Sequence, residues 1–464
     1  MKEHGQSRCA RTGALVIALM RVATYAGLLL LFFGLLGIRN WQLRNPSRTL
    51  AMTLLTWGCM SLAMHGVYGG YDIGVKKNKP ILTGMLLSTL CTDLVTYLAL
   101  QIMNVNDHNN DHLVLLGPDA LMLAGVFALQ VLLLYIMIRL GNTVFFRFHA
   151  PQRSLLIVGS DADAAQAAPK IGRYRLQWRI EDVAPCDAED IAERISRADA
   201  VFLAGVPDDR RLTLMQECYR QRCDIYCKAQ LNDVMLASSR HMVVDDTLFL
   251  AVDHCKMTNT QRFVKRLMDI VISVLVLVLL SPMIALIAVA IRAEDHGSVL
   301  FRQRRATLNG RTFIIYKFRT MREDGGRAVS ATEADERITR VGAFLRRWRL
   351  DELPQLMNVL RGDMSLVGPR PEMLENVERY KVSLPAFAYR EQMKAGLTGY
   401  AQIEGRYNTA PEDKLMLDLM YIEDFSIFED MKLLLRTATV FFKKDSTEGF
   451  HADGRSRQQR ADRL

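Results

Sequence analysis

The chain has 464 residues and a formal net charge of +9; half of its residues are hydrophobic and 23% are charged. This composition excludes a disordered or collagen-like chain, and eight cysteines are too few for a small scaffold held by disulfides. At roughly 150 residues per domain, the length predicts about three folding units.

Four apolar runs occupy the first part of the chain. They cover about residues 13–38, 49–68, 81–103 and 119–139. Each run is near or above the roughly 20 residues that a helix needs to cross a bilayer. We therefore predict four transmembrane helices within residues 1–140. The first is expected to be an uncleaved anchor, because no small-residue cleavage site follows a short apolar core.

The charges of the connecting segments predict the orientation of these helices. The connection 104–118 carries aspartates and no Lys or Arg, which favours the outside, whereas 66–80 and 139–153 are basic and favour the cytoplasm. Arginines in the first loop do not fit this N-inside, C-inside arrangement. Arg21 and Asp93 lie inside the predicted spans, where they either pair with each other, reach the interface or take part in transport.

The segment 152–255 is predicted to be a small parallel α/β domain. A buried strand at 154–160 ends in glycine and precedes a helix-like stretch at 162–169, and further strands are expected at 198–205 and 223–227. Only Gly159 stands at the first turn, where a full G-x-G-x-x-G pattern would mark a dinucleotide site. Nucleotide binding is therefore only weakly supported here.

A fifth apolar run, 271–291, is interrupted by Ser281 and Pro282. Proline removes a backbone donor and clashes with the preceding turn, so a helix bends or breaks there. Basic residues flank the run on both sides, which favours both ends on the cytoplasmic side. We predict a re-entrant helix over 265–292; the alternative is a kinked span that would export everything after it.

Arginines and carboxylates gather between residues 296 and 430. Asp351 and Glu352 are adjacent, with Arg346 shortly before them and Arg370 after them. Such a group suits phosphoryl chemistry, because one carboxylate can attack phosphorus, a second can hold Mg²⁺, and arginines neutralise phosphate oxygens. An isolated Asp-Glu pair is usually only a solvated helix surface, but the surrounding arginines favour the catalytic interpretation.

At these residues the chain resembles the bacterial sugar transferases, the monotopic polyprenyl-phosphate phosphoglycosyl transferases. Its N-terminal helices make it similar to the long form, such as undecaprenyl-phosphate galactose or glucose phosphotransferases. Ala395 departs from the family pattern, where proline is usual, and Ala306-Thr307 replaces a common Val-Gly; both put loop rigidity in doubt more than activity. The similarity covers about 260–445 and runs through blocks at 281–282, 301–303, 317–321, 350–355, 358–372, 394–402 and 418–426.

The resemblance implies transfer of a sugar 1-phosphate from a UDP-sugar to undecaprenyl phosphate, giving undecaprenyl-diphosphate-sugar and UMP. This would be the first membrane step of exopolysaccharide, capsule or O-antigen (lipopolysaccharide) synthesis. It implies that Asp351 is the nucleophile of an aspartyl-phosphosugar intermediate and that Glu352, with Asp351, holds Mg²⁺. The positions implied to bind phosphate or substrate are Lys317, Arg319, Arg346, Arg370 and Gln303.

The hydropathy pattern, the composition and the resemblance together predict an architecture. A four-helix transmembrane bundle would be followed by a Rossmann-like domain at 152–255 and by an α/β catalytic domain at 260–445. The re-entrant hairpin would anchor the catalytic domain, and residues 446–464 would form a flexible tail. The protein would be a multi-pass protein of the bacterial cytoplasmic (inner) membrane, in contact with membrane lipid, with its catalytic domain facing the cytoplasm.

Two other classes of function compete with this one. A membrane protein that assembles or regulates polysaccharide export without turnover is disfavoured by the intact carboxylates and Arg370. A nucleic-acid-binding protein is suggested only by the window 261–350, where 17 Lys/Arg face 8 Asp/Glu. Its arginines lack interleaved aromatic residues and a helix-turn-helix pattern, so no nucleic acid is expected as partner. The identity of the sugar stays open, with an unmodified hexose favoured, and a homodimer is compatible with the sequence.

Overall fold

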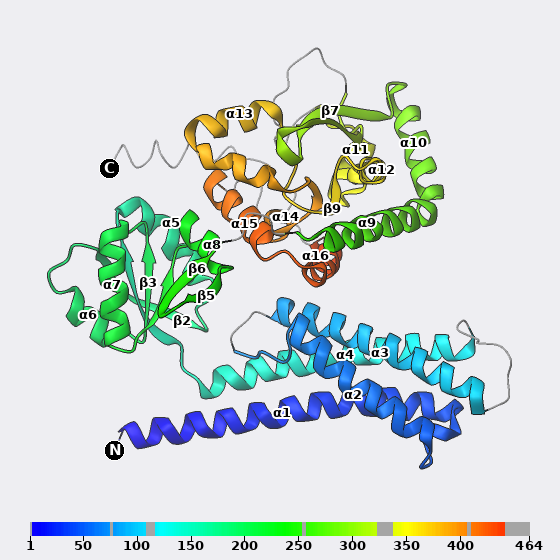
Figure 1. Cartoon of the computed structure of the whole chain (residues 1–464), viewed down its shortest axis with the longest axis horizontal. Helices are drawn as coiled ribbons and strands as arrows, with labels where there is room; N and C mark the ends of the chain where they lie inside the picture. The colour runs from blue at the N-terminus through cyan, green and yellow to red at the C-terminus, as the bar shows by residue number, and fades with distance from the viewer. Residues whose placement is uncertain are drawn as a thin grey trace. The chain divides into compact units, whose positions relative to one another are not determined.

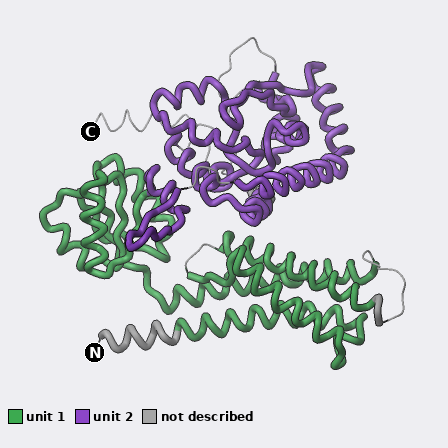
Figure 2. The backbone as a smooth tube through the Cα atoms, viewed as in Figure 1, with its two compact units in different colours: residues 1–228 green, residues 229–464 purple. Residues whose placement is uncertain are grey.

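The computed structural model describes residues 2–74, 78–107, 117–252, 257–322, 337–405 and 410–440, with the side chains of 2–12, 105–107 and 438–440 left aside. The chain divides into two compact units, residues 1–228 and 229–464 (Figure 2). The predicted tail at 446–464, and most of the connection 104–118, lie outside the described residues.

Four long helices begin the first unit (Figure 1): α1 (Lys2–Arg39), α2 (Arg48–Tyr68), α3 (Asn78–Asp107) and α4 (Pro118–Phe148), with a short 3-10 turn η1 (Trp41–Leu43) between the first two. All four are long and apolar enough to cross a membrane, which confirms the prediction of four such helices. Helix α2 packs against α3, and α1 against α4.

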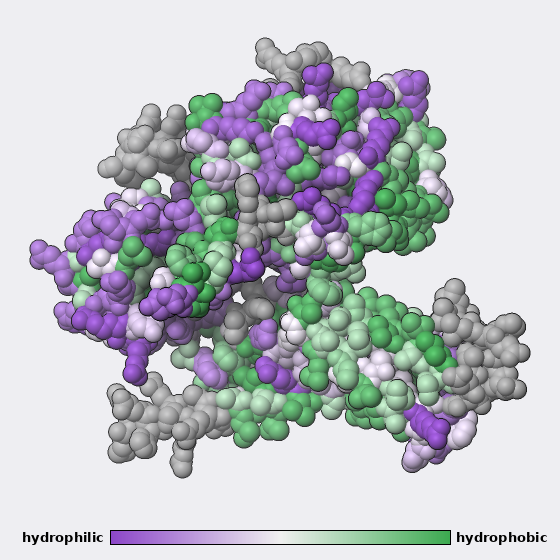
Figure 3. All heavy atoms as spheres, viewed as in Figure 1, coloured by the Kyte–Doolittle hydropathy of each residue, from purple (hydrophilic) through white to green (hydrophobic). Residues whose placement is uncertain are grey.

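The outer surface of these helices is apolar. Figure 3 shows hydrophobic residues gathered over the visible face of α2, α3 and α4. Leu62 and Leu121 are 80% and 79% exposed, whereas Leu28, Phe32 and Val126 are buried in the bundle core. Exposed leucine on a long apolar helix is expected of a surface that faces lipid.

The charged residues inside these helices lie apart. Arg21 donates from Nη2 to the carbonyl oxygen of Tyr71, over 3.2 Å. Asp93 is 1% exposed and lies beside Trp57 and Gln130. In the described part of the chain, the structure therefore does not bring Arg21 and Asp93 into the ion pair that was one of the sequence-based alternatives.

An α/β domain follows the four helices. Its elements are β1 (Gln152–Val158), α5 (Asp161–Gly172), β2 (Trp178–Pro185), α6 (Ile191–Arg197), β3 (Ala200–Ala204), α7 (Asp208–Arg220) and β4 (Asp224–Cys227). The strands are parallel in the order β2-β1-β3-β4, with Leu155 paired with Val201. The three strands predicted from sequence are present, and β2 is an additional one.

The turn after β1 carries an acidic side chain where a nucleotide phosphate would have to bind. The Ser160 hydroxyl caps α5 by accepting from the Asp163 amide, and it donates to the Asp163 carboxylate over 2.6 Å. A Cβ on Gly205 would meet Asp163 Oδ2 at 2.1 Å, so this carboxylate fills the space between the two turns. The helix N-terminus that binds phosphate in dinucleotide folds is thus occupied by the protein's own anion.

The second unit begins with α8 (Leu231–Ala237) and an antiparallel hairpin, β5 (Arg240–Val244) and β6 (Thr247–Ala251). The segment predicted as one domain, 152–255, therefore contributes strands to both units. Helices α9 (Asn259–Leu279) and α10 (Ser281–Asp295) come next, followed by a second antiparallel pair, β7 (Leu300–Ala306) and β8 (Thr312–Phe318), joined by the 3-10 turn η2 (Leu308–Gly310).

The rest of the unit is mainly helical, around a short parallel pair of strands. It comprises α11 (Arg340–Arg347), η3 (Leu350–Glu352), α12 (Gln355–Arg361), β9 (Ser365–Val367), α13 (Leu374–Ser383), η4 (Pro385–Gln392), β10 (Gly396–Thr398), α14 (Tyr400–Ile403), α15 (Pro411–Glu423) and α16 (Ile427–Val440). Strands β9 and β10 pair in parallel. Leu366, Val359 and Phe387 belong to the core that surrounds them.

The fifth apolar run is broken where the sequence predicts it. Helices α9 and α10 are bent by 63°, and the Ser281 hydroxyl donates to the carbonyl oxygen of Val278 over 2.8 Å. Pro282 stands in the first turn of α10, where its missing N–H costs nothing. Apolar side chains cover the outer face of both helices (Figure 3), with Leu279 74% and Leu286 70% exposed.

Buried polar contacts fix α9 to β9, the strand that leads into the Gly-Pro-Arg-Pro segment 368–371. The Asp269 carboxylate accepts from the Ser365 hydroxyl at 3.1 Å and from the Leu366 amide at 3.0 Å. The Lys265 ammonium donates to the Val367 carbonyl at 3.1 Å and forms a buried ion pair with Asp430. The helix that carries the broken apolar run is thereby held to the strand beside the candidate site.

Candidate active site

Asp351 and Glu352 lie in the 3-10 turn η3, between α11 and α12. The Thr339 hydroxyl caps α11 by accepting from the Gly342 amide at 2.9 Å. Arg349, just before η3, has a φ of +51°, a left-handed conformation that is uncommon for a residue other than glycine. This turn ends the preceding helix and presents the two carboxylates on a short, tightly wound segment.

Glu352 is held between two cations. Its Oε1 atom lies 3.0 Å from Lys317 Nζ, at the end of β8, and 3.9 Å from Arg370 Nη2. Burial by itself would raise the pKa of Glu352, but Lys317, Arg370 and Arg349 outweigh it and hold this pKa well below its usual range. Glu352 is therefore ionised at neutral pH, although its side chain is only 18% exposed.

The pKa of Asp351 is shifted in the opposite direction. Burial, followed by the adjacent Glu352 charge, raises the pKa of Asp351 to about 6, and the positive charges of Lys317 and Arg346 only partly oppose this. Two neighbouring carboxyl groups whose pKa values are pushed apart are typical of functional sites, where one group takes part in chemistry and the other supplies a fixed charge.

Arg346 and Arg319 both have partners within the fold. Arg346 donates from Nε to the Thr320 hydroxyl at 2.8 Å, and its charge still acts on Asp351. The Arg319 guanidinium is 7% exposed, pairs with Asp295 at the end of α10, and lies directly over Gly297. The contacts of Arg319 are thus those of a structural ion pair, and its implied role in phosphate binding stays a prediction.

Gln303 makes a hydrogen bond with Arg305, another arginine near the carboxylates. Its Oε1 atom accepts from Arg305 Nη2 at 2.6 Å, and Arg305 Nη1 donates to the Pro371 carbonyl at 3.1 Å. Burial, followed by repulsion from Arg370, lowers the pKa of Arg305 to about 10, so the group remains a cation at neutral pH. Arg305 is missing from the sequence-based site, although it lies two residues from Gln303 on β7 and so on the same face of the strand.

Of the residues expected from the sequence, Lys317, Glu352 and Arg370 line one polar pocket, whereas Asp351, Arg346, Arg319 and Gln303 are not among its lining residues. Cations from three separate segments and the Glu352 carboxylate face it, together with the side chain of Gln355, which sequence reasoning also missed. The residues that line the pocket are Arg305, Ile315, Lys317, Glu352, Gln355, Arg370, Pro371, Gly396 and Leu397. A pocket with this lining suits an anionic, phosphate-bearing ligand.

The segment that carries Arg370 is fixed by backbone contacts to β10. The Gly368 amide donates to the Thr398 carbonyl, and the Gly396 amide donates to the Pro369 carbonyl, each over 2.8 Å. A Cβ on Gly368 would lie 2.3 Å from the Lys394 carbonyl oxygen, so the close approach requires glycine.

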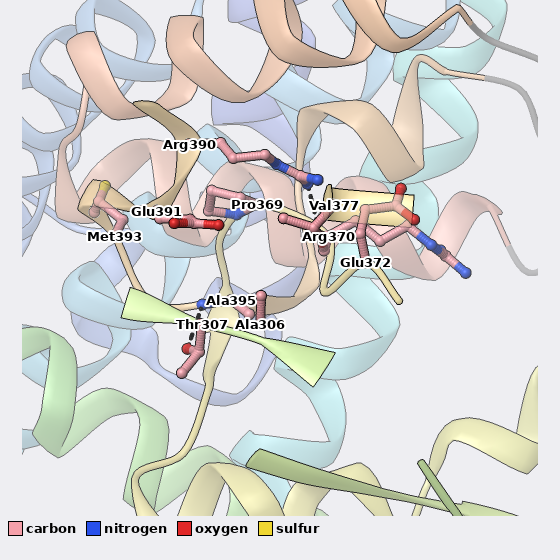
Figure 4. Close-up of a pocket in the computed structure, with 10 residues that line it drawn as sticks. All are labelled: Ala306, Thr307, Pro369, Arg370, Glu372, Val377, Arg390, Glu391, Met393 and Ala395. Carbon is pink, nitrogen blue, oxygen red and sulfur yellow. Dashed lines mark hydrogen bonds between the residues drawn. The ribbon is translucent and has the colours of Figure 1, made fainter. Parts of the chain in front are cut away.

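A buried arginine supports the same segment from the other side. Arg390 Nη2 donates to the Arg370 carbonyl oxygen at 2.6 Å (Figure 4). The same nitrogen lies 2.7 Å from Asp418 Oδ2. Both side chains of the pair are almost fully buried, at 6% and 2% exposure. Next to them, Lys414 and Glu372 form a further pair at 3.5 Å. These contacts set the backbone from which the Arg370 side chain reaches Glu352.

The two positions that depart from the family pattern contact each other. The Thr307 hydroxyl accepts from the Ala395 amide at 3.1 Å and donates to the Asp363 carbonyl at 3.0 Å. A proline at 395 would have no N–H, and a glycine at 307 would have no hydroxyl. The two replacements are therefore complementary, because Ala395 supplies an amide N–H and Thr307 supplies the hydroxyl oxygen that accepts it.

Comparison with known proteins identifies the second unit. A family model described as bacterial sugar transferase matches residues 260–444. The UDP-glucose:undecaprenyl-phosphate glucose-1-phosphate transferase of Caulobacter vibrioides is 44% identical over 189 residues, which are 39% of this chain and 71% of that protein. The chain belongs to the bacterial sugar transferase family.

Two further relatives differ in the sugar that their names specify. The UDP-N-acetylgalactosamine-undecaprenyl-phosphate N-acetylgalactosaminephosphotransferase of Aeromonas hydrophila is 41% identical over 180 residues, covering 38% of this chain and 43% of the relative. The undecaprenyl-phosphate glucose phosphotransferase of Komagataeibacter xylinus is 33% identical over 317 residues, covering 61% and 58% respectively. The match thus spans about half the length of these two relatives.

Proposed function

We propose that this protein transfers a sugar 1-phosphate from a UDP-sugar to undecaprenyl phosphate and releases UMP. The observation that carries the proposal is the Asp351-Glu352 pair, with Glu352 held by Lys317 and Arg370 in a pocket lined by cations. The names of the relatives support the same reaction, since they specify undecaprenyl phosphate as acceptor and either glucose or N-acetylgalactosamine as sugar. The product would enter exopolysaccharide, capsule or O-antigen synthesis.

The proposed reaction has two steps. An oxygen of the Asp351 carboxylate attacks the phosphorus that bears the sugar, and the bond from that phosphorus to the UMP oxygen breaks, so that UMP leaves with the bonding electrons. An oxygen of the lipid phosphate then attacks the same phosphorus, and the bond to Asp351 breaks, which regenerates the carboxylate. Lys317 and Arg370 neutralise the negative charge that gathers on the phosphoryl oxygens.

Mg²⁺ fits the donor groups of this site. Magnesium is usually bound by one or two carboxylates together with substrate phosphates, rather than by a complete protein cage. Glu352, kept ionised by its cations, lines the pocket, and Asp351 precedes it in the same 3-10 turn, so the two offer such carboxylates. When bound, the ion would supply further positive charge to the phosphoryl oxygens.

We also propose that α9 and α10 enter and leave the membrane on the cytoplasmic side. The 63° bend and the basic flanks support a hairpin, which would place the site on the side where UDP-sugars occur. The test is single cysteines at the exposed residues Thr260 and Thr312, in a background without other reactive thiols. Both should stay protected from a membrane-impermeant thiol reagent in intact cells, and labelling of the 312 site from outside would refute the hairpin.

The reaction is tested with the full-length protein in nanodiscs, undecaprenyl phosphate and a panel of UDP-sugars, scored by UMP release. Glu352→Gln should reduce release by at least a hundredfold, because the pocket loses the charge that Lys317 and Arg370 surround. Glu378→Gln, at an exposed carboxylate of α13, is the matched control and should behave as wild type. A folded wild-type protein that releases no UMP with any sugar would favour the non-catalytic assembly protein instead.

A further inference from the structure

One residue at the pocket has a buried side-chain nitrogen that makes no hydrogen bond within the described part of the chain. Gln355 is the first residue of α12, is 3% exposed, and lines the same pocket as Lys317, Glu352 and Arg370. Among the described residues, its Nε2 atom is buried and has no hydrogen-bond partner. A buried donor without a partner is unfavourable, and folded proteins leave few of them.

The same helix shows what a structural amide looks like. Asn358, one turn further along α12, is fully buried and uses both ends of its side chain. Its Nδ2 donates to the Ile314 carbonyl at 2.7 Å and to Asp363 Oδ2 at 3.2 Å, and its Oδ1 accepts from the Tyr316 amide at 3.0 Å. Asn358 therefore ties α12 to β8, whereas Gln355 lines the pocket and its donor has no partner among the described residues.

The lining of the pocket indicates what the free donor meets. Arg305, Lys317 and Arg370 bring positive charge to it, so the ligand must be an anion with several acceptor oxygens. A neutral amide adds a hydrogen bond to such a ligand without adding further charge repulsion among the cations. A site that leaves a buried donor unpaired until its ligand arrives also discriminates strongly against ligands that lack the acceptor.

We propose that Gln355 is a substrate-binding residue whose side-chain amide donates a hydrogen bond to a phosphoryl oxygen in this pocket. The proposal rests on the proposed function, in which two phosphate-bearing substrates visit the site. The oxygen belongs either to the diphosphate of the UDP-sugar or to the lipid phosphate, and the two sources separate in the kinetics below.

The test compares two variants of the full-length protein that remove a buried amide from the same helix. Gln355→Met keeps the length of the side chain and removes its donor. Asn358→Leu keeps the approximate size of the Asn358 side chain and removes the amide that bonds to β8. Gln355→Met should leave the unfolding temperature unchanged or raise it, because the unpaired group disappears, while kcat/KM for UMP release falls about 10- to 100-fold. Asn358→Leu should lower the unfolding temperature, because its partners lose their bonds.

The half-reactions distinguish the two sources of phosphate. With the UDP-sugar alone, the burst of UMP reports only the first step. A slowed burst in Gln355→Met assigns the hydrogen bond to the donor diphosphate. A normal burst with a raised KM for undecaprenyl phosphate assigns it to the lipid phosphate.

A binding measurement keeps the inference separate from the proposed function. UDP should raise the unfolding temperature of the wild type. If the donor diphosphate is the partner of Gln355, the Gln355→Met variant should lose most of this increase. Inorganic phosphate serves as the second probe in the same measurement. A UDP shift lost in the variant, without turnover in the wild type, would contradict the reaction and keep the inference. The inference is overturned if the kcat/KM of Gln355→Met, and its increases in unfolding temperature with UDP and with phosphate, stay within twofold of the wild-type values. It is also overturned if Gln355→Met unfolds at a temperature as low as that of Asn358→Leu.

Discussion

The buried pair of Arg390 and Asp418 allows stability and activity to be separated. Arg390→Met removes a guanidinium that is 6% exposed and leaves the Asp418 carboxylate, 2% exposed, without its cation. Removing one partner of a buried pair typically costs about 3–5 kcal/mol, because an uncompensated charge stays behind. For a unit of this size, that corresponds to a decrease in unfolding temperature of roughly 6–20 °C.

A second substitution should restore stability without restoring activity. Asp418→Asn, added to Arg390→Met, removes the stranded charge while keeping the shape of the side chain, so most of the lost unfolding temperature should return. The carbonyl of Arg370 still lacks the donor that held it at 2.6 Å. Because a displacement of about 1 Å in a positioning residue can reduce a rate about a hundredfold, UMP release should remain about 10- to 100-fold below wild type.

The assay combines thermal unfolding in nanodiscs with UMP release for the wild type, both single variants and the double variant. The expected pattern is a destabilised, impaired Arg390→Met and a stable but impaired double variant. Normal activity in the double variant would refute the idea that Arg390 positions Arg370. An unchanged unfolding temperature in Arg390→Met would refute the structural importance of the pair.

Three further outcomes follow from the contacts described. In thermal unfolding, Lys265→Met should lower the unfolding temperature by an amount equivalent to about 3–5 kcal/mol. Adding Asp430→Asn to Lys265→Met should restore much of the lost unfolding temperature. Thr307→Val should cost about 1–3 kcal/mol in the same assay, and less in an Ala395→Pro background, where the amide donor is absent; equal costs in both backgrounds would contradict the coupling. Chelation with EDTA should stop UMP release, and added Mg²⁺ should restore it; full activity in EDTA would exclude the proposed ion.

Long apolar runs and dense motifs made much of this architecture predictable from sequence. The four N-terminal helices and the break at Ser281 and Pro282 follow from hydropathy and from the geometry of proline. Strands β1 and β3 are largely buried, and in the sequence they contain continuous apolar runs. Strand β2 was missed because most of its side chains are exposed or partly exposed and several are charged. Strands β9 and β10 have three residues each, too few to produce a pattern.

The sequence indicated candidate residues for the site but not their contacts. Asp351 and Glu352 are adjacent, and their arginine-rich surroundings pointed to phosphoryl chemistry. The pairing of Arg319 with Asp295, and of Arg390 with Asp418, depends on contacts between distant segments that no local pattern contains. Whether a residue in a motif faces the substrate or the fold is decided by such contacts.

The covalent role of Asp351 is the central claim, and intact-protein mass spectrometry tests it most directly. The wild-type protein, incubated with a UDP-sugar and Mg²⁺ but no lipid acceptor, should gain the mass of one sugar phosphate and release one equivalent of UMP, and adding undecaprenyl phosphate should remove the added mass. Asp351→Asn should gain no mass and release no UMP while keeping the wild-type unfolding temperature, because its amide cannot attack phosphorus as an anion. A sugar-phosphate adduct on the Asp351→Asn protein, or turnover above a few per cent of wild type, would contradict the account.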